Sequence, residues 1–258
     1  MEKIEVGRTG FDLICCAGFY TNSETINTLR QHMGDEYFPY SENVYINSTG
    51  AVYIKETEFE YRYFWSNLKK TFFTTLKIHA ARPDGNNIMN MNVADVWNKI
   101  KIAEQKLYSK YGLCVNEDRV EIHSAEINRT FVPIDEVHAY KRVFQLMAVV
   151  VLRHSGKKYD VSTEKLTNAF NQQGMLLKRK SYSYRVYDKA AQMKAEMAGI
   201  SFDSPLLRVE ITYHDKQTVL TDFKTLDLVD ITDEMVETVF CKRMGNIRKD
   251  IMEYLNQK

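Results

Sequence analysis

The sequence predicts an α+β protein in which helices pack on an antiparallel-rich sheet. Three patterns lead to this prediction. Segments between residues 43 and 80 alternate apolar and polar side chains, as half-buried strands do. Residues 93–111 repeat apolar side chains at helical spacing, and residues 206–213 alternate again. A length of 258 residues allows one large domain, or one domain with a small appendage.

The first part of the chain divides into a weakly patterned segment and a series of strands. Residues 1–40 contain short apolar pieces and one predicted helix, 23–33, which ends at Gly34. A turn at 47–50 and a loop at 82–87 interrupt the strands that follow. The predicted strands are 44–46, 51–54, 58–64 and 71–80.

The second part of the chain alternates helices and strands. Asn92 can cap the 93–111 helix, and Gly112 ends it. The later predicted elements are a strand at 119–131, helices at 133–154, 162–173 and 190–198, a strand that ends at Lys189, the 206–213 strand and a last helix capped by Thr232. Arg-Val-Glu-Ile occurs at both Arg119 and Arg208, either by chance or because two strands of a duplicated βαβ unit are equivalent.

Composition and motifs exclude several classes of protein. Lys and Arg number 35 against 34 Asp and Glu, so net charge argues neither for nor against a nucleic-acid partner. The four cysteines include no Cys-x-x-Cys pair, which favours free thiols over a zinc site. The sequence shows no signal peptide and no Walker A motif or dinucleotide fingerprint. The longest apolar run, 146–152, is far short of the ~20 residues of a membrane span. We therefore expect a soluble cytoplasmic protein without a membrane segment.

Reactive side chains fall on one face of three predicted strands, because side chains alternate along a strand. In the strand that ends at Lys189, that residue shares a face with Arg185 and Tyr187, whereas Tyr182 and Tyr184 lie on the packing face. The polar faces of the two other strands carry Arg208, Glu210 and Thr212, and Ser124, Glu126, Asn128 and Thr130.

A tyrosine, a lysine and two carboxylates suit covalent chemistry on a phosphodiester. The Tyr187 hydroxyl, with an ordinary pKa near ~10, needs help to attack phosphorus. Lys189, two residues along, can lower that cost or neutralise the phosphate. Glu126 and Glu210 can hold a divalent ion, Mg²⁺ or Mn²⁺, that polarises the phosphate. The product would be a phosphotyrosine linkage, which conserves bond energy for rejoining the strand.

The carboxylates and the tyrosine also have ordinary structural interpretations. Glu126 and Glu210 can form cross-strand salt bridges with Arg129 or Arg208, which contribute little to stability. Tyr187 is one of 16 tyrosines in the chain, and a tyrosine in a strand usually packs against its neighbours. The pattern of residues alone leaves both interpretations open.

Basic and histidine side chains give weaker signals. Lys178, Arg179 and Lys180 form a run that can follow a phosphate backbone, or can simply be solvated surface. His79 and His123 lie in strands near the candidate acids, where each can add a metal ligand or be a hydrogen-bonded structural histidine. No His-x-His or His-Glu-x-x-His motif is present.

Three segments resemble the filamentous-phage gene II/X type family of replication initiators, which act in rolling-circle replication, with a looser similarity to the plasmid Rep_trans initiators. The segments are Ser124-Ala-Glu-Ile-Asn-Arg-Thr-Phe131, Tyr184-Arg-Val-Tyr-Asp-Lys189 and Leu207-Arg-Val-Glu-Ile211. Their order and the helix between the first two also match. The strand at 75–79 with its Pro-Asp-Gly-Asn-Asn loop resembles the region before the family's first long helix, so the resemblance covers about residues 43–212.

The resemblance implies a rolling-circle initiator that nicks and rejoins one DNA strand at an origin through a covalent link to tyrosine. The family's nucleophile falls on Tyr187, its lysine on Lys189, and its metal-binding acids on Glu126 and Glu210. The implied cofactor is a divalent metal, Mg²⁺ or Mn²⁺. The expected DNA-binding residues are Arg185, Arg208, Lys178, Arg179 and Lys180.

One position departs from the family pattern. Lys77 stands in the upstream strand, where related chains can carry an acid, so the metal shell is incomplete and Glu121 becomes a rival to Glu126.

We expect an N-terminal segment at 1–42, a catalytic domain at 43–228 and a C-terminal helix at 229–258. The expected partners are single-stranded or supercoiled origin DNA, a host helicase and a second copy of the chain, with no membrane. Two alternatives stay open: a non-catalytic DNA-binding replication or regulatory protein of a mobile element, and an unrelated α+β interaction protein.

Overall fold

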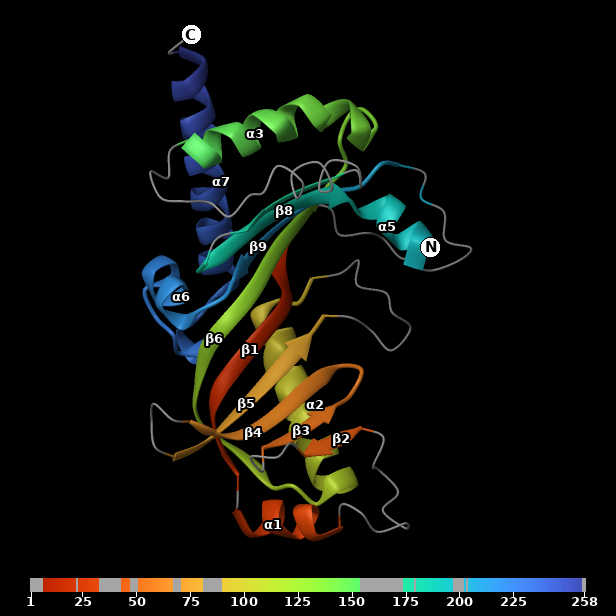
Figure 1. The fold of residues 1–258 in the computed structure, drawn as a ribbon, viewed down its shortest axis with the longest axis vertical. Coiled ribbons are helices and arrows are strands. Elements are labelled where there is room, and N and C mark those ends of the chain that lie inside the picture. The colour runs from red at the N-terminus through yellow and green to blue at the C-terminus, as the bar shows by residue number, and fades with distance from the viewer. Residues whose placement is uncertain are drawn as a thin grey trace.

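The structure is a computed structural model, and it describes residues 7–21, 23–32, 43–46, 51–66, 71–80, 90–153, 174–178, 180–196, 202 and 204–256. Within these residues the chain forms one sheet of nine strands, and every pair of neighbouring strands is antiparallel. Helices pack on this sheet, so the predicted α+β class is confirmed (Figure 1).

The strands are β1 (Thr9–Thr21), β2 (Val44–Ile46), β3 (Val52–Lys55), β4 (Phe59–Ser66), β5 (Thr71–His79), β6 (Val115–Phe131), β7 (Gly174–Lys178), β8 (Tyr182–Asp188) and β9 (Leu207–Tyr213). The α-helices are α1 (Ser23–His32), α2 (Val93–Tyr111), α3 (Lys141–Arg153), α5 (Lys189–Glu196), α6 (Lys216–Phe223) and α7 (Asp233–Asn256). Two short 3₁₀ helices are η1 (Val137–Tyr140) and η2 (Leu228–Asp230).

Strand β1 lies at the centre of the sheet, whose order is β2-β3-β4-β5-β1-β6-β9-β8-β7. The sequence did not reveal this strand, although it is 13 residues long. Its pairing with β6 shifts register between Phe11 and Leu13, between Cys15 and Cys16, and between Ala17 and Phe19. Each shift interrupts the alternation of apolar and polar residues, so the period of two that marks a strand is lost.

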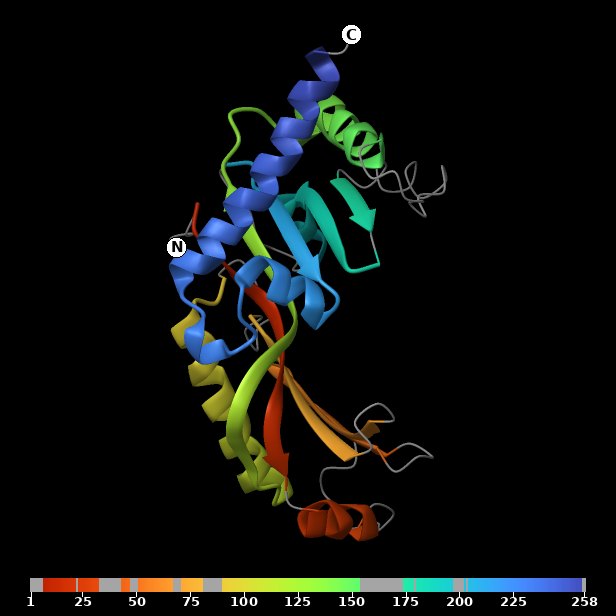
Figure 2. The same ribbon diagram turned by 90° about the vertical axis from the view of Figure 1, so that its left-hand side faces the viewer.

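Gly18 shows why the last of these irregularities needs glycine. Its φ of +93° lies in a region that side chains disfavour, and an added Cβ would lie 1.7 Å from the carbonyl oxygen of Arg119. The two longest strands of the sheet can therefore stay in contact past this point, and Figure 2 shows β1 and β6 running side by side.

One face of the sheet carries most of the apolar core. Helices α2 and α7 lie along one side of β1 and β6 in Figure 2, and α6 packs near the carboxyl end of β9. The buried apolar residues include Phe11, Ile14, Leu76, Ile100, Leu107, Ile127, Val209, Ile211, Phe223 and Phe240. The predicted caps of these two helices are confirmed. In α2, Asn92 and Asp95 form a capping box, and Gly112 is the C-cap. At the start of α7, the Thr232 hydroxyl accepts from the Met235 N–H.

Several predicted boundaries differ from the structure. Strand β6 starts at Val115 instead of Arg119, and the helix expected from Pro133 starts only with η1 and α3. Strand β7 and helix α6 were not predicted as elements, and the predicted helix at 162–173 lies outside the described residues. The two Arg-Val-Glu-Ile segments fall on the neighbouring strands β6 and β9, where Arg119 is exposed and Arg208 is fully buried. The repeated sequence therefore does not give the two arginines a common environment.

Both ends of the described chain join the same core. Strand β1 belongs to the central sheet, and α7 places Val236, Val239 and Ile247 in the apolar cluster. The division into 1–42, 43–228 and 229–258 stays a prediction. Among the helices that the structure describes, none combines the length and the apolar character needed to span a membrane.

Candidate active site

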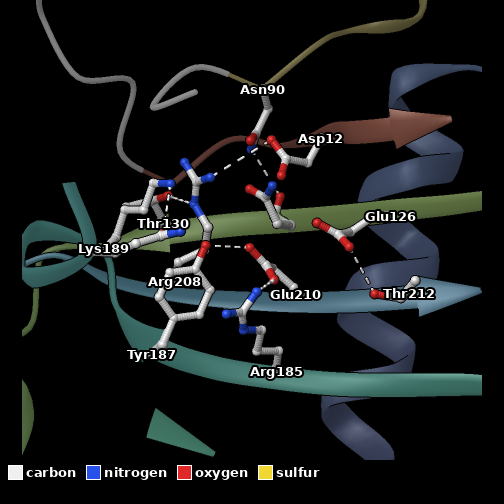
Figure 3. Close-up of polar contacts among 12 residues, drawn as sticks. Asp12, Asn90, Glu126, Thr130, Arg185, Tyr187, Lys189, Arg208, Glu210 and Thr212 are labelled. Carbon is white, nitrogen blue, oxygen red and sulfur yellow. Dashed lines mark hydrogen bonds and ion pairs between the residues drawn. The ribbon is translucent and has the colours of Figure 1, made fainter. Parts of the chain in front are cut away.

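The polar face predicted from strand alternation exists in the structure. Antiparallel register places Asn128 opposite Glu210, and Thr130 opposite Arg208. The next strand continues these two rows, with Arg185 opposite Glu210 and Tyr187 opposite Arg208. Strands β6, β9 and β8 therefore bring their polar residues into one patch, on the face opposite α7 (Figure 3).

A third carboxylate, which the sequence did not reveal, completes an acidic cluster. Asp12 of β1 joins Glu126 of β6 and Glu210 of β9, and one oxygen atom from each lies within 4.8 Å of the others. Asp12 stands at the register shift between Phe11 and Leu13, and such a bulge redirects a side chain out of the regular alternation. A signal was present in the sequence, because Asp12 is the only charged residue between positions 8 and 24.

Tyr187 is bound directly to this cluster. Its hydroxyl donates to Glu210 Oε1 at 2.5 Å, and the Arg185 guanidinium lies 3.8 Å from Glu210 Oε2 and 4.7 Å from the centre of the Tyr187 ring. Glu126 accepts from the Thr212 hydroxyl at 3.0 Å. Glu210 does form a cross-strand ion pair, but with Arg185; of the two arginines considered as its structural partners, Arg129 pairs with Glu237 of α7 and Arg208 lies 3.9 Å from Asp12.

Burial and mutual repulsion raise the pKa values of the acidic side chains in this cluster. Burial, and after it the Glu210 and Asp12 carboxylates, raise the pKa of Glu126 to about 8. Burial also raises the pKa of Glu210, and the hydrogen bond from Tyr187 opposes that rise. The Tyr187 pKa rises as well, because the phenol is buried and faces the Glu210 carboxylate. A proton on Glu126, hydrogen-bonded to Asp12, thus reduces the negative charge that the three side chains would otherwise carry.

Two buried cations border the cluster. Arg208 is 0% exposed, donates through Nε to Thr130 at 3.0 Å and lies 3.9 Å from Asp12 Oδ1. Lys189 is also fully buried, donates to Gln192 of α5 at 3.0 Å and lies 5.9 Å from the centre of the Tyr187 ring. The burial of Arg208 leaves it no surface for the DNA contact expected from the sequence, so its partners are inside the site.

The residues present fit a hard divalent cation. Carboxylate oxygens are the preferred ligands of Mg²⁺ and Mn²⁺. Within the described ranges, the buried Asp12 Oδ1 has no hydrogen-bond partner, and neither does the side-chain amide of Asn128, which is 0% exposed. Buried polar atoms without partners are rare in folded proteins, and here they adjoin the three carboxylates. The acidic cluster could therefore bind a metal ion.

Other candidate ligands lie outside this cluster. His79 Nε2 is 3.7 Å from Glu60, and His123 packs against the Phe73 ring, so neither histidine belongs to the three-carboxylate group. Glu121 bridges by its backbone to Asp227, away from Asp12. Among the described residues, Asp12 and Glu126 belong to the three-carboxylate group, and Glu121 does not.

The other four basic residues expected to bind DNA divide into two groups. Arg185 is 52% exposed beside Glu210, and Lys180 is exposed at the turn before β8. Lys178 ends β7, and Arg179 lies outside the described residues. Arg185 and Lys180 thus have surface available for a phosphate backbone.

Comparison with known proteins gives little further information. No protein-family model and no curated protein sequence matches the chain. Among solved structures, the chain is similar to a rolling circle replication initiator protein from Geobacillus stearothermophilus, with a TM-score of 0.36 and 10% identity over 83% of this chain and 77% of that one. A likeness this distant does not support a conclusion about the fold or the activity.

Proposed function

We propose that the protein is a rolling-circle replication initiator that nicks and rejoins one DNA strand through a covalent phosphotyrosine intermediate. One observation carries the proposal: the Tyr187 hydroxyl donates to Glu210, one of three carboxylates whose oxygen atoms lie within 4.8 Å of one another. A nucleophile bound to an oxygen-rich cation site suits phosphoryl transfer to a protein side chain.

The proposed cation site consists of Asp12, Glu126 and Glu210. A divalent cation held there would polarise a phosphoryl oxygen and stabilise the charge that develops during transfer. The site forms from three strands, β1, β6 and β9, so the positions of its ligands depend on the whole sheet.

Glu210 would act as the base for Tyr187. Because burial raises the Glu210 pKa, this carboxylate accepts a proton more readily than an exposed one. The phenolic proton moves to Glu210 as the Tyr187 oxygen bonds to phosphorus. The bond from phosphorus to the 3′-oxygen breaks, and that oxygen takes a proton from solvent. A free 3′-hydroxyl is what a polymerase extends, and the reverse reaction rejoins the strand.

The basic residues would divide between substrate and site. Arg185 and Lys180 have exposed surface and would contact the phosphate backbone. Arg208 and Lys189 are buried and would hold Asp12 and the Tyr187 ring in place. The roles of Lys178 and Arg179, a host helicase and a second copy of the chain stay predictions.

The test is cleavage of a supercoiled plasmid that carries the DNA flanking the gene, with Mg²⁺ or Mn²⁺. We expect relaxation of the plasmid and a protein–DNA adduct that survives denaturation, and we expect Tyr187→Phe to lose both. Tyr213→Phe is the matched control, because the Tyr213 hydroxyl also donates to a carboxylate, Asp222, at 2.8 Å, but on the other face of the sheet.

Two results would count against the proposal. If Tyr187→Phe still forms the adduct, Tyr187 is not the nucleophile. If the wild-type protein binds this DNA but never cuts it, the non-catalytic DNA-binding function is the better assignment. The two results separate the nucleophile assignment from the function itself.

A further inference from the structure

Asn128 is buried at the centre of the site, yet its side chain has no partner among the described residues. The residue is 0% exposed, and within that part of the chain neither Oδ1 nor Nδ2 makes a hydrogen bond. A buried amide without partners loses its hydration and gains nothing in return, so an apolar residue would be more stable here. Such an amide needs an explanation.

The backbone around Asn128 is held firmly, so the amide cannot be explained by a loose segment. Asn128 pairs with Glu210 on one side and with Gly10 on the other. The Asn90 Nδ2 donates to the Asn128 carbonyl at 3.0 Å and to the Arg8 carbonyl at 3.2 Å. An added Cβ on Gly10 would lie 2.7 Å from both Asn90 Cβ and the Met91 carbonyl oxygen, so this segment lies directly against β1, where Met91 also bridges to Phe11. The main chain of Asn128 is therefore fixed by partners on both sides.

The atoms without partners near Asn128 are mostly acceptors. Among the described residues, Asp12 Oδ1 and Asn90 Oδ1 are buried without a hydrogen bond, as are Asn128 Oδ1 and Nδ2. Three acceptors and one donor cannot satisfy one another, because each hydrogen bond needs one of each. The Arg208 guanidinium lies 3.9 Å from Asp12 Oδ1, beyond hydrogen-bond distance, so the excess of oxygen lone pairs points to a further positive group. Asn128 pairs with Glu210, one of the three carboxylates of the cation site.

We propose that Asn128 is the uncharged fourth ligand of the cation site, with Oδ1 directed at the same divalent ion as Asp12, Glu126 and Glu210. This inference rests on the cation site of the proposed function. A neutral oxygen adds a ligand without adding to the repulsion that already raises the pKa of Glu126. Amide oxygens are ordinary ligands of hard cations, and Mg²⁺ prefers several oxygens around it.

The experiment measures Mn²⁺ binding by calorimetry and thermal unfolding, without DNA, in the wild type and four variants. Asp12→Asn removes one carboxylate of the cation site and tests that site itself. Asn128→Leu removes both amide atoms at nearly constant volume, and we expect Mn²⁺ affinity to fall at least tenfold while the metal-free midpoint stays equal or rises. Asn128→Asp keeps an oxygen, so Mn²⁺ affinity is maintained or increased while the metal-free midpoint falls. Ser124→Ala is the matched control on the same strand, at a polar position opposite Cys15, and its Mn²⁺ affinity should stay within threefold of the wild type.

The possible outcomes separate this inference from the proposed function. If Asp12→Asn abolishes Mn²⁺ binding and Asn128→Leu leaves the affinity unchanged, the cation site stands and Asn128 is not a ligand. If Asn128→Leu instead lowers the metal-free midpoint with unchanged affinity, a buried water satisfies the amide and the inference fails. If neither the wild type nor Asn128→Asp binds Mn²⁺, the cation site itself is wrong.

Discussion

Raising the pH should destabilise the metal-free protein through Glu126, and a divalent cation should reverse the effect. The pKa of Glu126 rises from its ordinary 4.5 to about 8, first because of burial and then because of the Glu210 and Asp12 carboxylates. A group whose pKa is higher in the folded state than in the unfolded state stabilises the fold while it is protonated. That contribution is complete below about pH 4.5 and is lost as the pH rises through 8.

The size of the effect follows from the same shift. Each pH unit between the two pKa values removes about 1.4 kcal/mol of folding free energy. Between pH 6 and pH 8 the metal-free protein should therefore lose about 2 kcal/mol through Glu126. For a chain of this size that loss lowers the unfolding midpoint by roughly 4–8 °C.

The assay is thermal unfolding followed by circular dichroism at pH 6 and pH 8, with a chelator or with Mg²⁺. Glu126→Gln is the reference, because it keeps an acceptor for Thr212 and cannot ionise. The increase in unfolding midpoint on addition of Mg²⁺ should be larger at pH 8 than at pH 6, because at pH 6 the cation must displace a proton from Glu126. If the unfolding midpoints of the wild type and of Glu126→Gln change by the same amount between pH 6 and pH 8, Glu126 is already ionised at pH 6 and the prediction is wrong.

Two further predictions concern the frame of the site. Gly10→Ala should lower the free energy of unfolding by about 1–3 kcal/mol, because the new Cβ would lie 2.7 Å from the Met91 carbonyl. Gly245→Ala is the control, since Gly245 has open space around it in α7, and this variant should raise stability slightly. Chemical denaturation of both variants checks the prediction. Arg208→Met should lower the free energy of unfolding by about 3 kcal/mol, because it removes a buried cation beside Asp12. Arg119→Met, at an exposed ion pair, should leave the unfolding midpoint nearly unchanged. Equal midpoints for the two variants would contradict the role given to Arg208.

Local signals allowed much of the fold to be predicted. The α2 helix carries its own cap and stop, so Asn92 and Gly112 mark its ends without knowledge of any neighbour. Strand β1 could not be found in this way, because its bulges break the alternation and its pairing with β6 is decided by residues far along the chain. Predicting it requires the partner strand to be known first.

The same distinction explains which parts of the site were predictable. Alternation placed Tyr187, Arg185 and Glu210 on one face, and their contacts confirm that arrangement. Asp12 escaped detection because a bulge, not alternation, directs its side chain into the site. The burial of Arg208 could not be predicted either, because exposure depends on what covers the sheet rather than on the strand itself.

The two faces of β8 and β9 distinguish a structural polar group from one kept for binding. On the packing face, the Tyr213 hydroxyl donates to Asp222 at 2.8 Å and Arg243 donates to the same carboxylate at 2.5 Å, so phenol, acid and cation satisfy one another. On the other face, Tyr187 also donates to an acid, Glu210, but the neighbouring Asp12 and Asn128 keep buried atoms that make no hydrogen bond to any described residue. The same strands build both faces, so topology does not force the second arrangement. Buried atoms without hydrogen bonds on the Tyr187 face cost stability, whereas the satisfied polar groups around Tyr213 do not. We therefore infer that the arrangement on the Tyr187 face is kept for a bound cation.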